Sequence, residues 1–501
     1  MSGDRLLRST AVFSSMTFIS RVSGLVRDQV YAAVFGAGPA MDAFVVAFRI
    51  PNFMRRLSAE GSFSMAFVPV LAEYKAKGDQ VAVKALIDRV AGTLSAFLLV
   101  LVAVAVLAAP WVVRLFAPGF SVGSEQALLA TEMLRITFPY VLFISLASMA
   151  GGILNSYQRF AIPALSPVLM NLSMIAAALG LVPLMASWGY EPVVALAWGV
   201  FAAGILQLAF HLPSLARLGV LPRPRWGGAD PGVRKIMKLM VPTLFGASVA
   251  QVNLLLNTMM ASFLVGGSVT WLYYSDRLLE FPLGMFGVAI GTVILPHLSS
   301  RHSATDPQGY SKGLDWGFRL SLMIGIPSCI GLILCAGPLV ATLFQYGKFN
   351  AFHAQMTSLS VMTQSIAVPA FLLVKVLAPA FFSRQDTRTP VKAAVVSVIA
   401  NVVFTLLLFA GLLWFTDIGQ AALVKSGGRW FAALGHIPGA HALLALAIAL
   451  AGWLNALQLW WYLRRESVYQ VQPGWRRFLC QISVAGVGMT LVLLALLWLW
   501  P

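Results

Sequence analysis

Charged side chains occur inside segments that are otherwise apolar enough to cross a membrane. The first of these segments, residues 9–35, contains Arg21, Arg27 and Asp28. On a helix these three residues and Gly24 lie within about 120° of arc. A guanidinium group stays charged and can bind two phosphate oxygens at once. The segment therefore predicts one polar helix face that suits a phosphate-bearing ligand.

Two later segments carry further charges. In residues 42–72, Asp42, Arg49 and Arg56 are seven residues apart and so share one helical stripe. Glu60 lies four residues after Arg56 and can pair with it, which leaves Arg55 less obviously neutralised. In residues 270–296, Arg277 has two acidic neighbours, Asp276 and Glu280. One more cation, Lys375, falls in residues 356–382.

The number of buried cations decides how they must be placed. Eight Lys and Arg residues fall inside predicted spans, and each costs about 3 kcal/mol at the bilayer centre. Facing lipid, they would together cost on the order of 20 kcal/mol, so some must line a hydrated interior. We predict that four of them bind a pyrophosphate or another polyanion: Arg21, Arg27, Arg55 and Arg277. The supporting cavity charges are Asp28, Asp42, Arg49, Glu60, Asp276, Glu280 and Lys375. In the alternative interpretation, the arginines pair with these acids as ties between helices.

The composition is that of a polytopic membrane protein. Of 501 residues, 59% are hydrophobic and 11% charged, and the mean hydropathy is +0.82. Long apolar runs without strand-like alternation predict an all-α fold. Thirteen spans are expected, at 9–35, 42–72, 83–109, 126–154, 160–184, 192–214, 232–264, 270–296, 316–337, 356–382, 390–412, 440–463 and 478–500.

The basic residues indicate the orientation of these spans. With the N-terminus in the cytoplasm, 23 of the 35 Lys and Arg residues fall in cytoplasmic ends and loops, and four fall on the other side. This asymmetry follows the positive-inside rule. The net charge of +17 therefore reports topology, and we expect no nucleic-acid partner.

An internal repeat predicts two related halves. "PWVVRLFAPG" (110–119) matches "PLVATLFQYG" (338–347) at an offset of 228, and two further matches have offsets of 227. The offset contains six spans, so both copies enter the membrane with the same orientation, related by a pseudo-two-fold axis along the membrane normal. We expect a six-helix lobe at 1–216, a cytoplasmic linker at 217–231, a second six-helix lobe at 232–465 and an extra C-terminal helix at 466–501. Two such lobes are typical of alternating-access transporters.

Long motifs resemble one protein family. They are "SSMTFISRVSGLVRDQVYAAVFGAGPAMDAFVVAFRIPNFMRRLSAEGSFSMAFVPVLAEY" (14–74), "YYSDRLLEFPLGMFGVAIGTVILPHLS" (273–299), "FQYGKF" (344–349) and "VKVLAPAFFSRQDTRTPVK" (374–392). Each is similar to the MurJ (MviN) family of bacterial lipid II flippases. The resemblance implies a fold of the multidrug/oligosaccharidyl-lipid/polysaccharide exporter type with fourteen spans, one more than expected here.

The resemblance also implies a function. The expected activity moves undecaprenyl-pyrophosphate-linked peptidoglycan precursor between the leaflets of the bacterial inner membrane for peptidoglycan and cell wall biogenesis, with membrane lipids as neighbours. The family's cavity arginines fall on Arg21, Arg27, Arg55 and Arg277, and Asp42, Glu60, Glu280 and Lys375 fall on charged family positions.

Several other functions were weighed against a flippase. A flippase makes no covalent change, so we expect no catalytic residue, no cofactor and no metal site. The sequence has no Walker A motif, which disfavours direct use of ATP. The membrane potential or a Na⁺ or H⁺ counter-ion is the expected energy source. An antiporter of small drugs on the same fold is the main alternative, but its cationic substrates would favour acidic walls. A membrane enzyme acting on polyprenyl phosphates would need a cluster of metal-binding carboxylates, and the sequence offers none.

Overall fold

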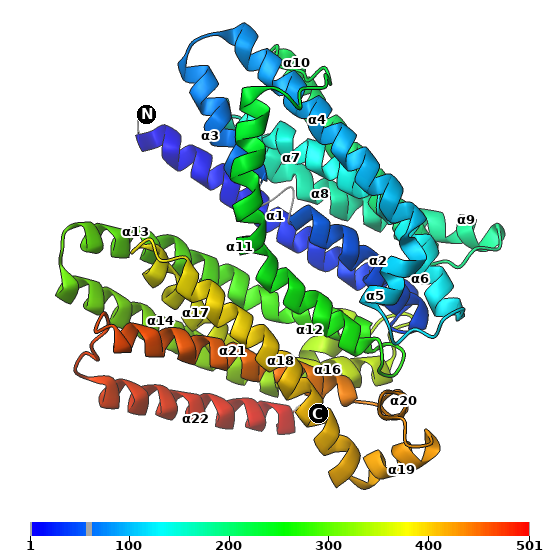
Figure 1. Ribbon diagram of the computed structural model, residues 1–501. Helices are drawn as coiled ribbons and strands as arrows, with labels where there is room; N and C mark the ends of the chain where they lie inside the picture. Colours follow the sequence, from blue (N-terminus) through cyan, green and yellow to red (C-terminus); the bar gives the residue numbers. More distant parts are fainter. Residues whose placement is uncertain (1–2, 57–62, 500–501) are drawn as a thin grey trace. The chain divides into compact units, whose positions relative to one another are not determined.

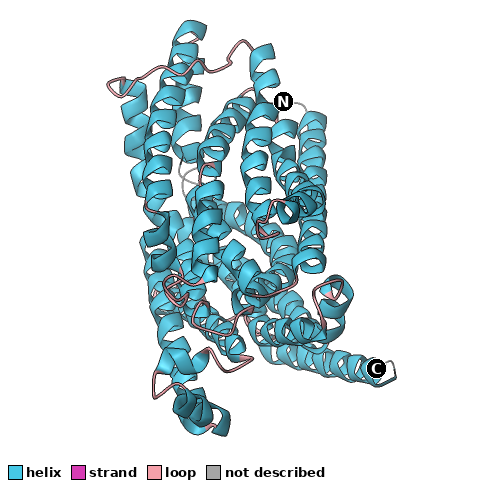
Figure 2. Cartoon of the chain, turned by 90° about the vertical axis from the view of Figure 1, so that its right-hand side faces the viewer, coloured by secondary structure: helices cyan, strands magenta, loops and turns pink. Residues whose placement is uncertain are grey.

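The computed structural model describes residues 3–56 and 63–499. Within these residues the regular structure consists of helices alone, joined by loops and turns, as Figure 2 shows. The chain divides into two compact units. The first contains residues 1–259 with 346–348, and the second contains residues 260–345 with 349–501.

The helices of the first unit are coloured from blue through cyan to green along the chain in Figure 1. Long helices alternate with short ones, and one turn of π-helix, η2, interrupts the fifth predicted span. Its elements are α1 (Gly3–Phe35), α2 (Pro39–Arg55), α3 (Phe63–Ala76), α4 (Gln80–Leu107), α5 (Ala109–Phe116), α6 (Glu125–Thr137), α7 (Tyr140–Ser156), α8 (Ala161–Ala176), η2 (Ala177–Leu181), α9 (Val182–Ser187), α10 (Val194–Arg217) and α11 (Pro231–Ala261), the last through Met259.

The second unit contains the remaining helices. A π-helical turn, η3, joins its first two helices into one long apolar stretch. Its elements are α12 (Ser268–Pro282), η3 (Leu283–Gly287), α13 (Val288–Ser303), α14 (Pro307–Leu334), α15 (Ala336–Phe344), α16 (Ala351–Ser365), α17 (Val368–Phe382), α18 (Arg388–Phe415), α19 (Asp417–Lys425), α20 (Trp430–Leu434), α21 (Ala440–Arg465) and α22 (Trp475–Leu499).

Most predicted spans correspond to helices that are long and apolar enough to cross a membrane. Within the described residues nine stretches satisfy both conditions, and α16 with α17 would make a tenth. They coincide with the predicted spans at 83–214 and at 270–500. The other three predicted spans, 9–35, 42–72 and 232–264, contain α1, α2 with α3, and α11. The chain is therefore a polytopic α-helical membrane protein, and the count of thirteen stays a prediction.

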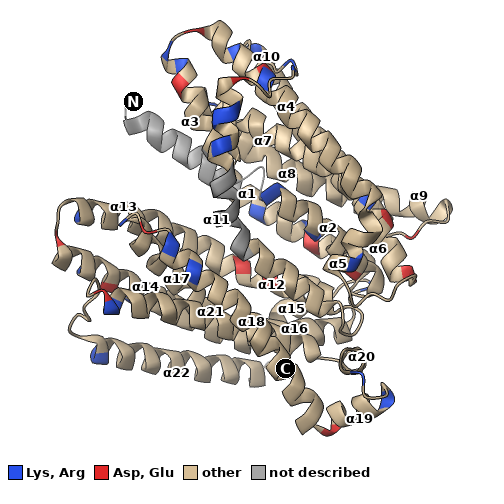
Figure 3. Cartoon of the chain, in the orientation of Figure 1, with Lys and Arg blue, Asp and Glu red and all other residues tan. Residues whose placement is uncertain are grey.

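Charged side chains are scarce along the middle of several of these long helices (Figure 3). Figure 3 shows α4, α18 and α22 with little charge along most of their length. In α22 the basic residues are Arg476 and Arg477, both in the first turn. Uncharged helix centres with basic ends are what an apolar membrane core requires.

The sequence repeat is accompanied by matching helix boundaries. Asp79 and Asp306 are both N-cap residues, of α4 and α14, and each accepts backbone N–H groups of the following turn. Ser124 and Asn350 cap α6 and α16 in the same way. In both copies a long helix, a short helix and a capped third helix follow one another. The shared N-caps explain why these helices begin at equivalent residues in the two copies.

The first turns of α11 pack on α3 and α4. Val233 and Ile236 belong to a buried apolar cluster with Leu71 and Leu86, and Lys235 pairs with Glu73 at 2.6 Å. The part of α11 up to Met259 accordingly belongs to the first unit, whereas the predicted second lobe begins at 232. The predicted division into two six-helix lobes and a linker stays a prediction.

Helices α16 and α17 form one bent stretch. Their axes differ by 42° across the break at residues 366–367. The backbone carbonyl of Ile366, at this break, accepts a hydrogen bond from the indole Nε1 of Trp453 on α21 at 2.9 Å. A helix break exposes backbone groups that must find partners in an apolar environment. The indole supplies one of these partners.

Candidate functional site

Arg27 lies at the contact between α1 and α8. Its Nη2 and Nε donate to Oδ1 of Asp28 at 2.7 and 3.0 Å, and its Nη1 donates to Oδ1 of Asn171 at 3.0 Å. The side chain also lies over the ring of Tyr31, 5.6 Å from the ring centre. Arg27 is 5% exposed and Asp28 is 1% exposed. This cation is therefore compensated by a carboxylate and an amide inside the first unit.

Asn171 joins this cluster to the preceding turns of α1. Its amide nitrogen donates to the backbone carbonyl of Ser20 at 3.1 Å and to the hydroxyl of Ser23 at 2.9 Å. Gly24 faces the same amide, since a Cβ at this glycine would lie 3.6 Å from the nitrogen. Arg21 is exposed. The predicted polar face of α1 thus divides into a part packed on α8 and an accessible arginine.

Arg49 of α2 and Arg56, the residue that follows α2, are directed toward α11. Arg49, which is 7% exposed, donates from Nη1 to Oγ1 of Thr258 at 2.6 Å. Arg56 donates from Nη1 to Oε1 of Gln251 at 3.5 Å. Arg49 and Arg56 are seven residues apart, and so are their partners Thr258 and Gln251, which run in the opposite direction. The two helices are therefore antiparallel where these side chains meet. Arg49 and Arg56 of the predicted stripe thus contact one neighbouring helix within the first unit.

The remaining α2 charges have separate surroundings. Asp42 is 2% exposed in the first turn of the helix. Arg55 is half-buried and donates from Nε to Oδ1 of Asn52 at 2.9 Å. Glu60 lies outside the described residues, and so does its predicted pairing with Arg56.

Arg277 of α12 lies in the second unit. Its Nη1 donates to Oε2 of Glu280 at 2.9 Å, and its Nη2 donates to the hydroxyl of Tyr273 at 3.3 Å. The guanidinium carbon is 4.9 Å from the centre of the Tyr273 ring. The side chains of Arg277 and Glu280 are 29% and 54% exposed, so this ion pair remains accessible to solvent or ligand.

Asp276 and Lys375 complete the set of predicted site residues. Oδ1 of Asp276 accepts from Nε2 of Gln364 on α16 at 2.7 Å, and the Gln364 Oε1 accepts from Ser275 at 3.1 Å. Lys375 on α17 is exposed, and its side chain passes η3 beside Gly287. Asp276 is thus held by an amide, and Lys375 keeps its charge accessible.

The structure therefore pairs some of the predicted residues and leaves others accessible. Arg27–Asp28 and Arg277–Glu280 are ion pairs. The alternative interpretation expected such pairs of arginines with acids, as ties between helices. Each pair joins residues of a single helix, however, so neither is itself a tie between helices. Of the four predicted pyrophosphate ligands, Arg21, Arg55 and Arg277 have accessible surface. Arg21 and Arg55 belong to the first unit and Arg277 to the second, and their predicted convergence stays a prediction.

The residue types that complete these clusters were not identified from the sequence. Asn171 and Gln364 are nearly buried amides, 6% and 5% exposed, in long apolar helices. A lone amide in an apolar span is a signal of interhelical hydrogen bonding and could have indicated both.

Two histidines are covered by helix packing. The sequence places the histidines mostly near span ends, which suggests interfacial rather than catalytic positions. His211 and His441 are buried, 1% and 0% exposed, and contact the backbone carbonyls of Gln207 and Met356 at 2.7 and 2.8 Å. Both therefore have a backbone partner within the protein.

Comparisons with known proteins agree on one family. The family model described as "Lipid II flippase MurJ" matches residues 31–501. The chain is 42% identical over 497 residues to the probable lipid II flippase MurJ of Vibrio cholerae, covering 98% of this chain and 89% of the relative. It is 42% identical over 496 residues to the lipid II flippase MurJ of Burkholderia cenocepacia, with the same two coverages.

Solved structures agree with the fold. A lipid II flippase MurJ in an inward closed conformation matches with a TM-score of 0.73 at 24% identity, covering 97% of this chain and 99% of that one. An inward-facing multidrug transporter of the MATE family and MOP superfamily matches with a TM-score of 0.68 at 14% identity, covering 91% and 98%. These two likenesses concern the fold, whereas the sequence relatives and the family model establish the family. The chain belongs to the MurJ family of lipid II flippases, which are inner-membrane transporters rather than enzymes.

Proposed function

We propose that this protein moves lipid II, the undecaprenyl-pyrophosphate-linked peptidoglycan precursor, from the inner to the outer leaflet of the cytoplasmic membrane. The observation that carries this proposal is 42% identity to lipid II flippases along 98% of the chain. An exporter of drugs on the same fold is supported only by likenesses at low identity, such as 14% to a MATE transporter.

Guanidinium groups are the proposed ligands of the pyrophosphate. Arg21, Arg55 and Arg277 have accessible surface, and the Arg277 side chain has one carboxylate partner with 54% exposure. A diphosphate can replace such a partner because it offers more oxygens to the same fork. Arg27 is proposed to contribute positive potential, and Asn171 holds its guanidinium in place.

Supporting charges are proposed to tune this binding. Asp28 and Glu280 pair with Arg27 and Arg277 and so reduce the net charge near each arginine. Asp42, Arg49, Glu60, Asp276 and Lys375 are the other expected contributors. We propose that transport is driven by the membrane potential, or by Na⁺ or H⁺, and that the N-terminus is cytoplasmic, as the basic loops favour.

The test is the leaflet distribution of lipid II in cells depleted of this protein. An external reagent that modifies lipid II should find less substrate after depletion, and the wild-type copy should restore it. Unchanged external lipid II in cells whose growth stops would contradict the proposal. A drug-export role would instead leave lipid II accessible while altering drug tolerance.

A further inference from the structure

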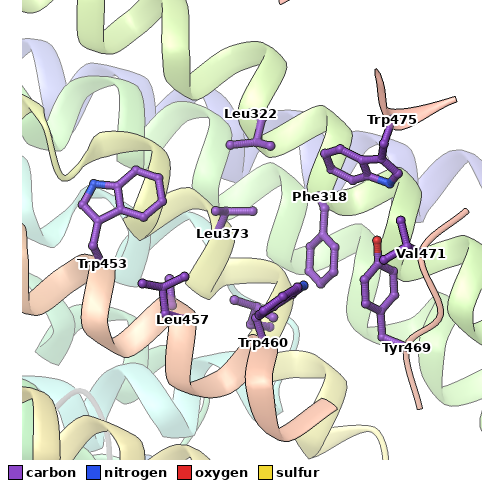
Figure 4. A pocket seen from close by; sticks show the side chains of 11 residues that line it. Phe318, Leu322, Leu373, Trp453, Leu457, Trp460, Tyr469, Val471 and Trp475 are labelled. Atoms are coloured by element: carbon purple, nitrogen blue, oxygen red, sulfur yellow. The ribbon is translucent and has the colours of Figure 1, made fainter. Parts of the chain in front are cut away.

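The second unit contains an apolar pocket of about 390 Å³ whose lining includes none of the predicted site residues. Figure 4 shows side chains from α14, α17 and α21 and from the connector at 466–474 directed into it. Its walls include Phe318, Leu373, Trp453, Leu457, Trp460 and Trp475. A concave site of this size with aromatic and aliphatic walls is suited to an apolar ligand.

The pocket lies on helices that cross the membrane and has an exposed rim. Both α14 and α21 are long and apolar enough to be spans. Leu457 on α21 and Val471 on the connector both line the pocket and are 55% and 51% exposed. Leu457 lies on a helix long and apolar enough to be a span, so its surroundings in a membrane are lipid and an acyl chain has direct access to the pocket from this side.

A buried carboxylate fixes one wall of the pocket. Oδ1 of Asp315, which is 4% exposed, accepts from the hydroxyl of Tyr469 at 2.8 Å and from the indole Nε1 of Trp475 at 2.6 Å. Its Oδ2 accepts from Nε of Arg319 at 2.7 Å. Asp315 thereby holds the connector against α14 and preforms the cavity.

Cations lie at the same end of the pocket. The Arg319 guanidinium carbon is 5.2 Å from the ring of Trp475, and its Nη2 donates to the carbonyl of Pro473 at 2.8 Å. Arg476 and Arg477 are exposed in the next residues and form no ion pair with any residue that the structure describes. Arg319 thus lies beside the pocket wall, and Arg476 and Arg477 follow the pocket residue Trp475 in the first turn of α22. An apolar slot with this basic segment next to it is complementary to a chain with an anionic head.

We propose that this pocket binds one acyl chain of an anionic glycerophospholipid, with the phosphate beside Arg319, Arg476 and Arg477. The bound lipid would fill the space between α14, α17 and α21 and neutralise the start of α22. The site is separate from the predicted substrate arginines, so this inference does not depend on the proposed function.

Photolabelling of the full chain in nanodiscs tests the proposal. The probe is phosphatidylglycerol with a diazirine in one acyl chain, and mass spectrometry locates the labelled residues. Labels should concentrate on 318–322 and 453–460 and fall when Ala456→Phe fills the pocket, where Ala456 is 3% exposed. Val484→Phe, at a residue 67% exposed on α22, is the matched control and should leave the pattern unchanged.

Substitutions of the arginines proposed to contact the lipid head group test the proposal even if Ala456→Phe does not fold. Arg476→Gln and Arg477→Gln should each weaken labelling roughly fivefold, whereas the exposed Arg234→Gln should not. Equal labelling of the pocket by a phosphatidylcholine probe would overturn the proposal. So would labels spread evenly over lipid-facing helices, or displacement of the probe by a polyprenyl diphosphate but not by unlabelled phosphatidylglycerol.

Discussion

The guanidinium of Arg27 on α1 and the amide of Asn171 on α8 form a hydrogen bond of 3.0 Å between residues that are 144 apart in the chain. The same amide also reaches back to Ser20 and Ser23. One side chain thus fixes the rotation of α1 against α8 and the position of a buried cation.

Replacing Asn171 tests this role. Asn171→Leu removes three hydrogen bonds and leaves a buried charge without its neutral acceptor, so we expect about 1–3 kcal/mol of destabilisation. Thermal unfolding of the purified protein in detergent measures the change. Asn171→Gln keeps the amide group on a longer side chain, so its stability should lie between those of the wild type and Asn171→Leu. Wild-type stability for Asn171→Leu would show that the cluster does not hold the helices.

Arg277 should matter for transport rather than for folding. Its side chain is partly exposed and pairs with a residue of its own helix, so Arg277→Ala should leave the protein inserted at normal amounts. Cells that rely on this variant should nevertheless fail to grow, because one proposed pyrophosphate ligand is lost. Complementation with immunoblotting is the measurement, and Arg159→Ala in a predicted loop is the control. Normal growth with Arg277→Ala would remove this residue from the proposed site.

The polar stripe between α2 and α11 is open to a double-mutant cycle. Arg49→Met and Thr258→Val each break the same 2.6 Å hydrogen bond, so their effects on unfolding should not add. We expect a coupling free energy of about 0.5–3 kcal/mol. Arg49→Met with the exposed Thr292→Val of α13 serves as an uncoupled pair. Additive effects at Arg49 and Thr258 would mean that the contact contributes nothing to stability.

Acid should loosen the first turn of α14. The backbone N–H of Gly309, and then Arg301, lower the pKa of Asp306 below its ordinary value of 3.8. A carboxylate whose pKa is lowered in the folded state stabilises that state fully at pH values above its ordinary pKa. This stabilisation is lost as the pH falls through the folded-state pKa. Hydrogen exchange at Gly309 should therefore accelerate, relative to the intrinsic rate, as the pH is lowered from about 6 to about 3. Asp306→Asn should show a flatter dependence, and an identical profile would contradict this origin.

Much of the fold could be predicted from the sequence because membrane spans are long and apolar. The nine long apolar stretches and the bent pair of α16 and α17 coincide with predicted spans, since a bilayer tolerates few other ways to satisfy the backbone. The same reasoning identified the charged residues as exceptions.

Side-chain partners were less predictable. Helical spacing correctly grouped Arg49 with Arg56, but it could not show that Thr258 and Gln251 face them, because that depends on which helices become neighbours. The pairing of Arg277 with Glu280 follows from their separation of three residues on one helix, whereas the contact of Arg27 with Asn171 spans two helices.

The break between α16 and α17 has a consequence for how the second unit can move. The indole of Trp453 on α21 donates to the carbonyl of Ile366 at the 42° bend. In a straightened helix that carbonyl would accept from the backbone N–H four residues further on, and the indole N–H would have to share it or lose its acceptor in an apolar environment. A change in the bend of α17 should therefore be felt by α21.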